Sequence, residues 1–163
     1  MSFYIIIRGP LGIGKSTISK ELARRLKAEY ISIDTILEEL DLDHIDEGLG
    51  CIAPENFLRV NQHILPKIRQ SLERGPVVID GNFYHREQIQ DLEENLKNTH
   101  YVFTLKAPLS VCIQRDSQRP KSYGKGAATA VHNLVSKFDS GTRINTEDKT
   151  AEEIVNEILS YIK

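Results

Sequence analysis

The sequence predicts a single α/β domain, in which helices cover both faces of a parallel sheet. Short apolar runs rich in β-branched residues alternate with stretches of helical periodicity along the whole chain. A glycine-rich loop, "RGPLGIGKSTIS", separates the first apolar run from the first helical stretch. A length of 163 residues suits one domain, so we expect residues 1–163 to form a single unit.

Composition limits the partners that the chain is expected to have. The net charge of −2 gives no general attraction for nucleic acid or an anionic membrane, although local basic patches could still form. No apolar stretch approaches the roughly 20 residues of a membrane span, and the N-terminus lacks a signal peptide's features. Cys51 and Cys112 have neither disulfide nor zinc spacing. We therefore expect a cytoplasmic protein without a membrane partner, as a monomer or a homodimer.

The first half of the chain starts with the clearest strand. Residues 3–7 form a continuous β-branched run, which is typical of a strand buried on both faces. Ile18, Leu22 and Leu26 recur every fourth residue and predict a helix. There follow a strand over 28–33, a helix over 35–40, an acidic loop over 41–54 and a helix over 55–75. Pro66 predicts a kink or a break in that last helix.

The second half continues the alternation of strands and helices. Strands are expected over 76–80, 100–107 and 141–146, and helices over 85–96, from Pro108, over 130–138 and at the C-terminus. Thr150 and Glu153 have the spacing of a capping box and predict the start of that last helix. Residues 119–129, "RPKSYGKGAAT", have no apolar face and are expected to form a mobile lid loop.

Gly9, Gly14, Lys15 and Ser16 match the phosphate-loop pattern G-x-x-x-x-G-K-[ST]. The small residues let backbone N–H groups converge, and a helix that begins near Lys15 adds the positive end of its dipole. Lys15 would reach the outer phosphates, and the Ser16 hydroxyl would hold Mg²⁺. Because a strand precedes the loop and a helix follows it, the sequence predicts a nucleotide site. Its expected residues are Gly9, Gly12, Ile13, Gly14, Lys15, Ser16 and Thr17.

Three classes of protein use this loop, and the sequence favours a small kinase. A GTPase switch would carry D-x-x-G and N-K-x-D, and neither pattern occurs. A motor or remodelling ATPase usually needs a larger domain and an oligomeric partner surface. A small kinase needs a short chain, a carboxylate near the acceptor and a basic mobile lid, and the chain offers all three.

Two aspartates end strands of the predicted sheet, at the edge where ligands of parallel sheets bind. Asp34 is expected to accept the proton of a substrate hydroxyl, with a helix N-cap as its alternative role. Asp80 follows the apolar run "PVVI" as in a Walker B strand and is expected to bind Mg²⁺. A turn-forming Asp-Gly is the alternative for Asp80.

The basic residues of "QRDSQRPKSYGKG" are the candidates for a lid over the phosphates. Arg115 and Arg119 lie one helical turn apart and are expected to spread transition-state charge, with a solvated basic face as the alternative. Arg59, Asn82 and Arg86 are weaker candidates for contacts with the acceptor.

The chain resembles the small P-loop kinases over essentially its whole length. "GPLGIGKST", "SID", "VVIDGN" and "RDSQR" fall in the order found in that family, which includes shikimate and gluconate kinases, chloramphenicol phosphotransferase, polynucleotide 5′-kinase and adenylate kinase-like proteins. The resemblance implies a three-layer P-loop NTPase fold with a five-stranded sheet in the order 2-3-1-4-5 and a small lid. It also implies ATP·Mg²⁺ as donor, Asp34 near the acceptor hydroxyl and the adenine near "INTEDKT".

Departures from individual branches bear on the acceptor. A shikimate kinase would carry a second aspartate at Ser32 and a glycine triplet at "DGN", and the chain has neither. "DGNFYHREQ" is more similar to the branch of polynucleotide kinase and antibiotic-modifying kinases. We therefore expect transfer of the γ-phosphoryl group of ATP·Mg²⁺ to a hydroxyl of a small molecule. The alternatives are a nucleoside, nucleotide or nucleic-acid 5′-hydroxyl kinase, or a nucleotide-binding protein without catalysis.

Overall fold

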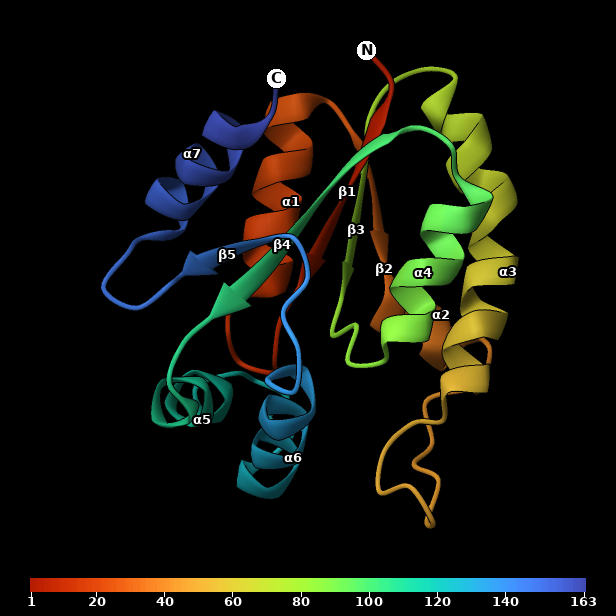
Figure 1. Cartoon of the computed structure of the whole chain (residues 1–163). Helices are drawn as coiled ribbons and strands as arrows, with labels where there is room; N and C mark the ends of the chain where they lie inside the picture. The colour runs from red at the N-terminus through yellow and green to blue at the C-terminus, as the bar shows by residue number, and fades with distance from the viewer.

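The computed structural model describes all 163 residues and has one sheet between two layers of helices (Figure 1). Five parallel strands lie in the order β2-β3-β1-β4-β5, which confirms the predicted fold class. The strands are β1 (Phe3–Arg8), β2 (Glu29–Ser32), β3 (Val77–Gly81), β4 (Thr99–Lys106) and β5 (Thr142–Asn145). The helices are α1 (Lys15–Leu26), α2 (Ile33–Glu39), α3 (Pro54–Leu72), α4 (Arg86–Asn95), α5 (Leu109–Ser117), α6 (Lys125–Val135) and α7 (Ala151–Tyr161). None of them combines the length and apolar character needed to span a membrane.

Both faces of the sheet are buried, which explains the uninterrupted apolar run of β1. Tyr4 and Ile6 belong to a core of 21 buried residues that includes side chains of α2, α3 and α4. Ile5 and Ile7 face the other way, into a core of 15 buried residues against α1 and α7. Because successive side chains of a strand point to opposite faces, the two helix layers together bury every residue of β1.

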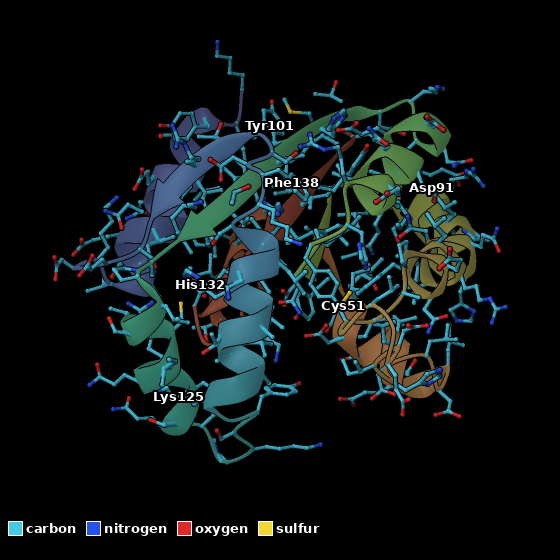
Figure 2. All side chains as sticks on the ribbon, turned by 60° about the horizontal axis from the view of Figure 1, so that its bottom comes forward. Cys51, Asp91, Tyr101, Lys125, His132 and Phe138 are labelled. Atoms are coloured by element: carbon cyan, nitrogen blue, oxygen red, sulfur yellow. The ribbon has the colours of Figure 1, made fainter.

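Arg8, the last residue of β1, is fully buried and ties the sheet to the C-terminal end of α6. Its guanidinium donates hydrogen bonds to the main-chain oxygens of Phe83 (3.3 Å), Val135 (3.1 Å) and Phe138 (3.0 Å). Burial lowers the pKa of Arg8 to about 10, which leaves the side chain cationic at neutral pH. In Figure 2, Phe138 lies beside the sheet and Lys125 lies at the far end of α6. One end of α6 is therefore anchored, and the other extends beyond the sheet.

Two expected element boundaries are wrong. The break at Pro66 does not occur, because α3 continues through it and buries an apolar face that outweighs one missing N–H donor. The loop expected over 119–129 is shorter, because α6 starts at Lys125 rather than at residue 130. The alanines of this stretch favour a helix, and Ala128 is fully buried.

Gly12 brings the loop between β1 and α1 into direct contact with α5. Its φ of +79° lies in the left-handed region, which strains any residue with a side chain. A Cβ atom at this position would lie 2.2 Å from the main-chain oxygen of Cys112. The backbone of the loop and the backbone of α5 therefore pack against each other with no side chain between them.

This contact predicts that Gly12→Ala destabilises the protein. The methyl group meets main-chain atoms that cannot rotate away, so we expect the free energy of unfolding to fall by about 1–3 kcal/mol. Gly126→Ala, in α6, is the matched control, because nothing lies within 4 Å of its Cβ position. Urea unfolding of both variants measures the difference. Equal stability of Gly12→Ala and the wild type would contradict the packing described.

Candidate active site

The loop between β1 and α1 forms the floor of a polar cavity of about 270 Å³. Gly12 and Gly14 both have positive φ, +79° and +93°, which turns the chain so that α1 begins directly at Lys15. No apolar residue lines this phosphate cavity, which is formed by Gly12, Gly14, Lys15, Ser16, Thr17, Arg115 and Arg119. Three cations, a helix N-terminus and no carboxylate make the cavity suitable for a polyanion.

Not every residue of the expected nucleotide site lines this cavity. Gly9 packs against Leu105, with only 3.3 Å between the position of its absent Cβ and the Leu105 side chain. Ile13 is buried and faces a neighbouring cavity instead. Lys15 is 7% exposed, and its Nζ donates a hydrogen bond of 3.4 Å to the main-chain oxygen of Pro10. Gly9 and Ile13 thus shape the loop, while Lys15 has its amino group in the cavity.

Arg115 and Arg119 enter the phosphate cavity in different ways. Arg115 lies on α5 and donates hydrogen bonds to the main-chain oxygen of Ile13 (3.2 Å) and the hydroxyl of Thr146 (3.3 Å). Arg119 lies beyond the end of α5, where its guanidinium packs 5.3 Å from the ring centre of Tyr123. Of the two arginines expected in the lid, Arg115 thus lies on α5 and bonds the loop after β5, whereas Arg119 lies on the segment that follows α5.

Asp116 is a functional candidate that the sequence reasoning missed. It is 1% exposed and accepts hydrogen bonds from the hydroxyl of Ser122 (2.8 Å) and the amides of Tyr123 (3.3 Å) and Gly124 (3.0 Å). Burial alone would raise the pKa of Asp116, but these donors and the nearby Arg119 outweigh it and lower the pKa. Asp116 therefore organises the loop that carries Arg119 and Tyr123.

Asp34 lies in the first turn of α2 and is partly buried, and its side chain makes no hydrogen bond within the protein. The N-cap of α2 is Ser32, whose hydroxyl accepts from the Thr35 amide (3.3 Å), so the alternative role of Asp34 as the cap does not hold. Burial is the main reason that the pKa of Asp34 is raised, while the positive charges of Lys15 and Arg119 partly lower it. A carboxylate with few solvating partners is a better proton acceptor than an exposed one.

Asp80 is the residue before the last of β3, and its carboxylate accepts a hydrogen bond from a residue that the sequence reasoning did not single out. The Tyr30 hydroxyl donates a 2.7 Å hydrogen bond to one carboxylate oxygen of Asp80, which is 3% exposed. Burial and the Asp80 carboxylate raise the pKa of Tyr30, and the hydroxyls of Ser16 and Ser32 partly offset this rise. Ser16 and Asp80 both lie near the Tyr30 hydroxyl and offer oxygen ligands, the type that Mg²⁺ prefers.

A second cavity, of about 310 Å³, opens on the other side of the phosphate loop. Leu11 lines it directly next to Gly12 of the phosphate cavity, so the loop contributes to both. Apolar and aromatic side chains form most of its walls, which comprise Leu11, Asp34, Leu37, Glu38, Asp43, Ile45, Ile52, Asn82, Tyr84, Tyr123, Ala127 and Val131. We call it the acceptor cavity, because Asp34 lies in it.

A third cavity, of about 270 Å³, adjoins the phosphate loop on the side of β5. Gly14, Thr17 and Arg115 line both this cavity and the phosphate cavity, and Lys149 and Ile154 also line the third cavity. Thr146 is fully buried directly after β5, and its hydroxyl donates a hydrogen bond to the main-chain oxygen of Lys106 (3.2 Å). Of residues 144–150, where the base of a nucleotide is expected, Lys149 lines this cavity.

Two expected acceptor contacts are absent from these cavities. Arg59 is exposed on α3 and lines none of the three. Arg86 stacks on the Phe138 ring at 4.3 Å, the same ring that Arg8 contacts, so it has a structural partner. Asn82, the third candidate, does line the acceptor cavity.

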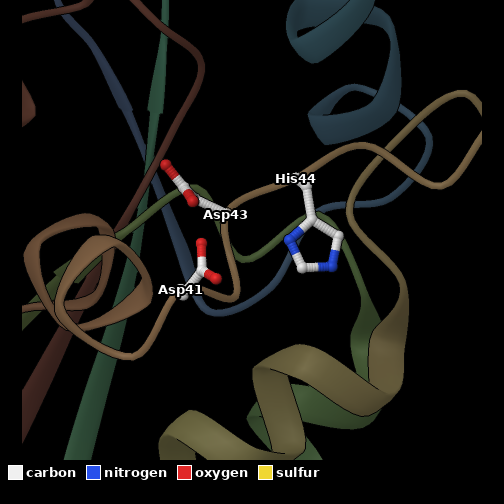
Figure 3. Close-up of side chains that lie close together, drawn as sticks. All are labelled: Asp41, Asp43 and His44. Atoms are coloured by element: carbon white, nitrogen blue, oxygen red, sulfur yellow. The ribbon is translucent and has the colours of Figure 1, made fainter.

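The acidic segment after α2 brings Asp41, Asp43 and His44 close together (Figure 3). Their potential ligand atoms lie within 4.8 Å of one another, and all three residues are exposed. Only Asp43 reaches the acceptor cavity. The cluster adds negative charge to the rim of that cavity. Exposed acidic residues are common in proteins without a bound metal, so the cluster is not assigned as a metal site.

Comparison with known proteins places this architecture among kinases. A family model described as an AAA domain matches residues 5–139. A shikimate kinase of Vibrio parahaemolyticus is 24% identical, over 98% of this chain and 95% of the relative. Among solved structures, a sugar kinase of Janibacter sp. has a TM-score of 0.80 at 15% identity and covers 99% of this chain and 95% of its own. The tunicamycin resistance protein of Deinococcus radiodurans has a TM-score of 0.73 at 19% identity, with 99% and 96% covered.

The raised pKa of Asp34 predicts that its charge opposes folding. A carboxyl whose pKa is higher in the folded state stabilises the fold only while it is protonated, and this contribution is lost as the pH rises through the folded pKa. Asp34→Asn is therefore expected to be more stable than the wild type at pH 8, and equally stable near pH 3.5. Thermal unfolding at both pH values measures this, with the exposed Glu39→Gln on the same helix as control. Lower stability of Asp34→Asn than of the wild type at pH 8 would contradict a raised pKa of Asp34 in the folded protein.

Asp116 should show the opposite dependence, because its pKa is lowered in the folded state. Such a carboxylate stabilises the fold above its unfolded pKa, and the contribution disappears as the pH falls through the folded value. We expect Asp116→Asn to be less stable than the wild type at pH 7, with a gap that narrows below about pH 4. Thermal unfolding at the same series of pH values measures this difference in stability. A difference that does not change with pH would mean that the charge of Asp116 does not stabilise the fold.

Proposed function

This chain belongs to the AAA domain family whose model matches residues 5–139 and is a phosphotransferase of the P-loop kinase type; we propose that it transfers the γ-phosphoryl group of ATP to a hydroxyl of a small molecule. The observation that carries the proposal is the meeting of two cavities at one loop. One is polar and cationic, and the other is largely apolar and contains Asp34. Donor and acceptor would thus approach each other across residues 11–12.

The donor triphosphate fits the phosphate cavity. Backbone N–H groups of the loop and the N-terminus of α1 would bind its oxygens, and Lys15 would exchange the Pro10 oxygen for a phosphate. The base and sugar would lie in the third cavity, past Thr17 and Arg115. Ser16 and the buried Asp80 offer hydroxyl and carboxylate oxygens that suit Mg²⁺, and such an ion would neutralise charge on the phosphates during transfer.

Asp34 is the residue that separates transfer from mere nucleotide binding. In the proposed step the acceptor oxygen attacks the γ-phosphorus, and the bond from phosphorus to the β,γ-bridging oxygen breaks. The hydroxyl proton passes to the Asp34 carboxylate, and ADP leaves. The raised pKa of Asp34 favours this proton transfer, since burial destabilises its charged form.

The arginines would stabilise the charge that spreads over the transferred group. Arg115 is held in place by Ile13 and Thr146, so it can contribute without reorganisation. Arg119 lies on the loop after α5 and can adjust its position when nucleotide binds. The loop of residues 118–124, with the first turn of α6, would then act as the lid over a single-domain active site.

Lys15→Ala is expected to weaken ATP·Mg²⁺ binding by about tenfold or more, because a charge-assisted contact with the phosphates is lost. The fold should be retained, since the Lys15 amino group has only one long hydrogen bond of 3.4 Å within the protein. Isothermal titration with ATP·Mg²⁺ measures the affinity, and Lys97→Ala, an exposed lysine far along the chain, is the control. Wild-type affinity in Lys15→Ala would rule out the proposed donor site.

Asp34→Asn should separate donor binding from transfer. Affinity for ATP is expected to stay within a few-fold of the wild type, while acceptor-dependent ADP release falls by about 10²-fold or more. The acceptor is found first by screening nucleosides, sugars, oligonucleotides and hydroxy acids with ATP·Mg²⁺ and the wild-type protein. Near wild-type transfer by Asp34→Asn would remove Asp34 as the base. A screen without any acceptor-dependent ADP would favour a nucleotide-binding protein without catalysis.

A further inference from the structure

We propose that the acceptor is a hydroxyl compound with an apolar body and no anionic group, and that a positively charged acceptor is preferred over a negatively charged one. The inference rests on the proposed function, because it concerns the second substrate of that reaction. It narrows the class of acceptors by the chemistry of the cavity walls alone.

The walls of the acceptor cavity suit a compound with substantial apolar surface. Eight of its twelve lining residues are hydrophobic. Two of them, Tyr84 and Tyr123, are aromatic and can pack against a ring or a flat aliphatic body. The Tyr84 hydroxyl accepts a hydrogen bond from the Ile52 amide (3.0 Å), which fixes the ring in the wall. A small, densely hydroxylated acid would leave most of this surface without a partner.

Charge is distributed unequally between the two adjoining cavities. The acceptor cavity is lined by the carboxylates of Asp34, Glu38 and Asp43 and by no lysine, arginine or histidine. The phosphate cavity has three cations and no carboxylate. With Asp34 reserved for the reacting hydroxyl, Glu38 and Asp43 remain at the rim, where they would repel an anionic substituent and attract a protonated amine.

The arginines that could have recognised an anionic acceptor are occupied or distant. Arg8 and Arg86 both pack against the Phe138 ring, with each guanidinium carbon 4.3 Å from the ring centre. Arg59 is exposed and lines no cavity. Arg119 lines the phosphate cavity, where the transferred group needs it. An acceptor with a carboxylate or phosphate would therefore lose solvation in the acceptor cavity, whose lining offers it no cationic partner.

Asn82 is a polar residue in the wall of the acceptor cavity. It lies directly after β3, is 8% exposed and lines the acceptor cavity. Its side-chain oxygen Oδ1 is buried and has no hydrogen-bond donor within the protein. The Asn82 side chain is neutral, so this part of the wall offers no cation to an anionic acceptor.

Three probes that share a benzene ring and a hydroxymethyl group test the proposal: 4-(hydroxymethyl)benzylamine, 4-methylbenzyl alcohol and 4-(hydroxymethyl)benzoate. Their dissociation constants are measured from the shifts of the Asn82 and Tyr84 amide signals of the ¹⁵N-labelled protein with ADP·Mg²⁺ at low salt. We expect the amine to bind about tenfold more tightly than the benzoate, with the neutral alcohol between them. Glu38→Gln/Asp43→Asn should bring the three affinities within about twofold, and Glu39→Gln should leave the order unchanged.

The outcomes distinguish this inference from the kinase assignment. Equal or tighter binding of the benzoate, or a charge preference that persists in the double variant, would overturn the inference. So would the absence of shifts at Asn82 and Tyr84 with all three probes. ADP release with ATP·Mg²⁺ is read separately across a wider panel of alcohols. Release that favours carboxylate-bearing acceptors would support the kinase and overturn the acceptor class, whereas the expected binding order without release would contradict the kinase alone.

Discussion

The site depends on a backbone-to-backbone contact between the phosphate loop and α5. At Gly12 there is no room for a side chain, because its Cβ would lie 2.2 Å from the main-chain oxygen of Cys112. This approach puts the next turn of α5 beside the loop, where Arg115 bonds the Ile13 oxygen and Asp116 organises residues 122–124. The shape of the loop, the position of a cation in the phosphate cavity and the conformation of the following segment all follow from this contact.

The two sides of the loop differ in charge. The phosphate cavity collects cations and the acceptor cavity collects carboxylates, and Asp34 lies where the two fields overlap. Burial raises the pKa of Asp34 and lowers that of the fully buried Arg8, so both groups are held in environments that disfavour their charge. The Arg8 guanidinium donates hydrogen bonds to three parts of the chain, whereas the Asp34 carboxylate accepts none. An ionisable group without a partner, placed in a cavity, is typical of a functional site rather than of a structural one.

Local sequence patterns were sufficient to predict the fold class. Alternating strand and helix signals predicted the α/β class, and the family resemblance alone implied the strand order that the sheet has. The Thr150 cap of α7 accepts a hydrogen bond from the Glu153 amide, as the spacing of the two residues indicated. What could not be predicted depends on contacts between distant segments. Arg86 was a candidate until Phe138, far along the chain, proved to be its partner, and Asp116 was missed because its donors lie on a loop of no regular structure. The early start of α6 also depends on burial of Ala128, which no local pattern contains.

A crystal structure with a non-hydrolysable ATP analogue and Mg²⁺ tests the central claim most directly, namely that one loop joins a donor site to an acceptor site at Asp34. The account predicts the triphosphate in the phosphate cavity and Lys15 moved from the Pro10 oxygen to a phosphate. It also predicts the γ-phosphate at the side that faces Asp34. Phosphates bound elsewhere, or a γ-phosphate separated from Asp34 by intervening protein, would contradict it.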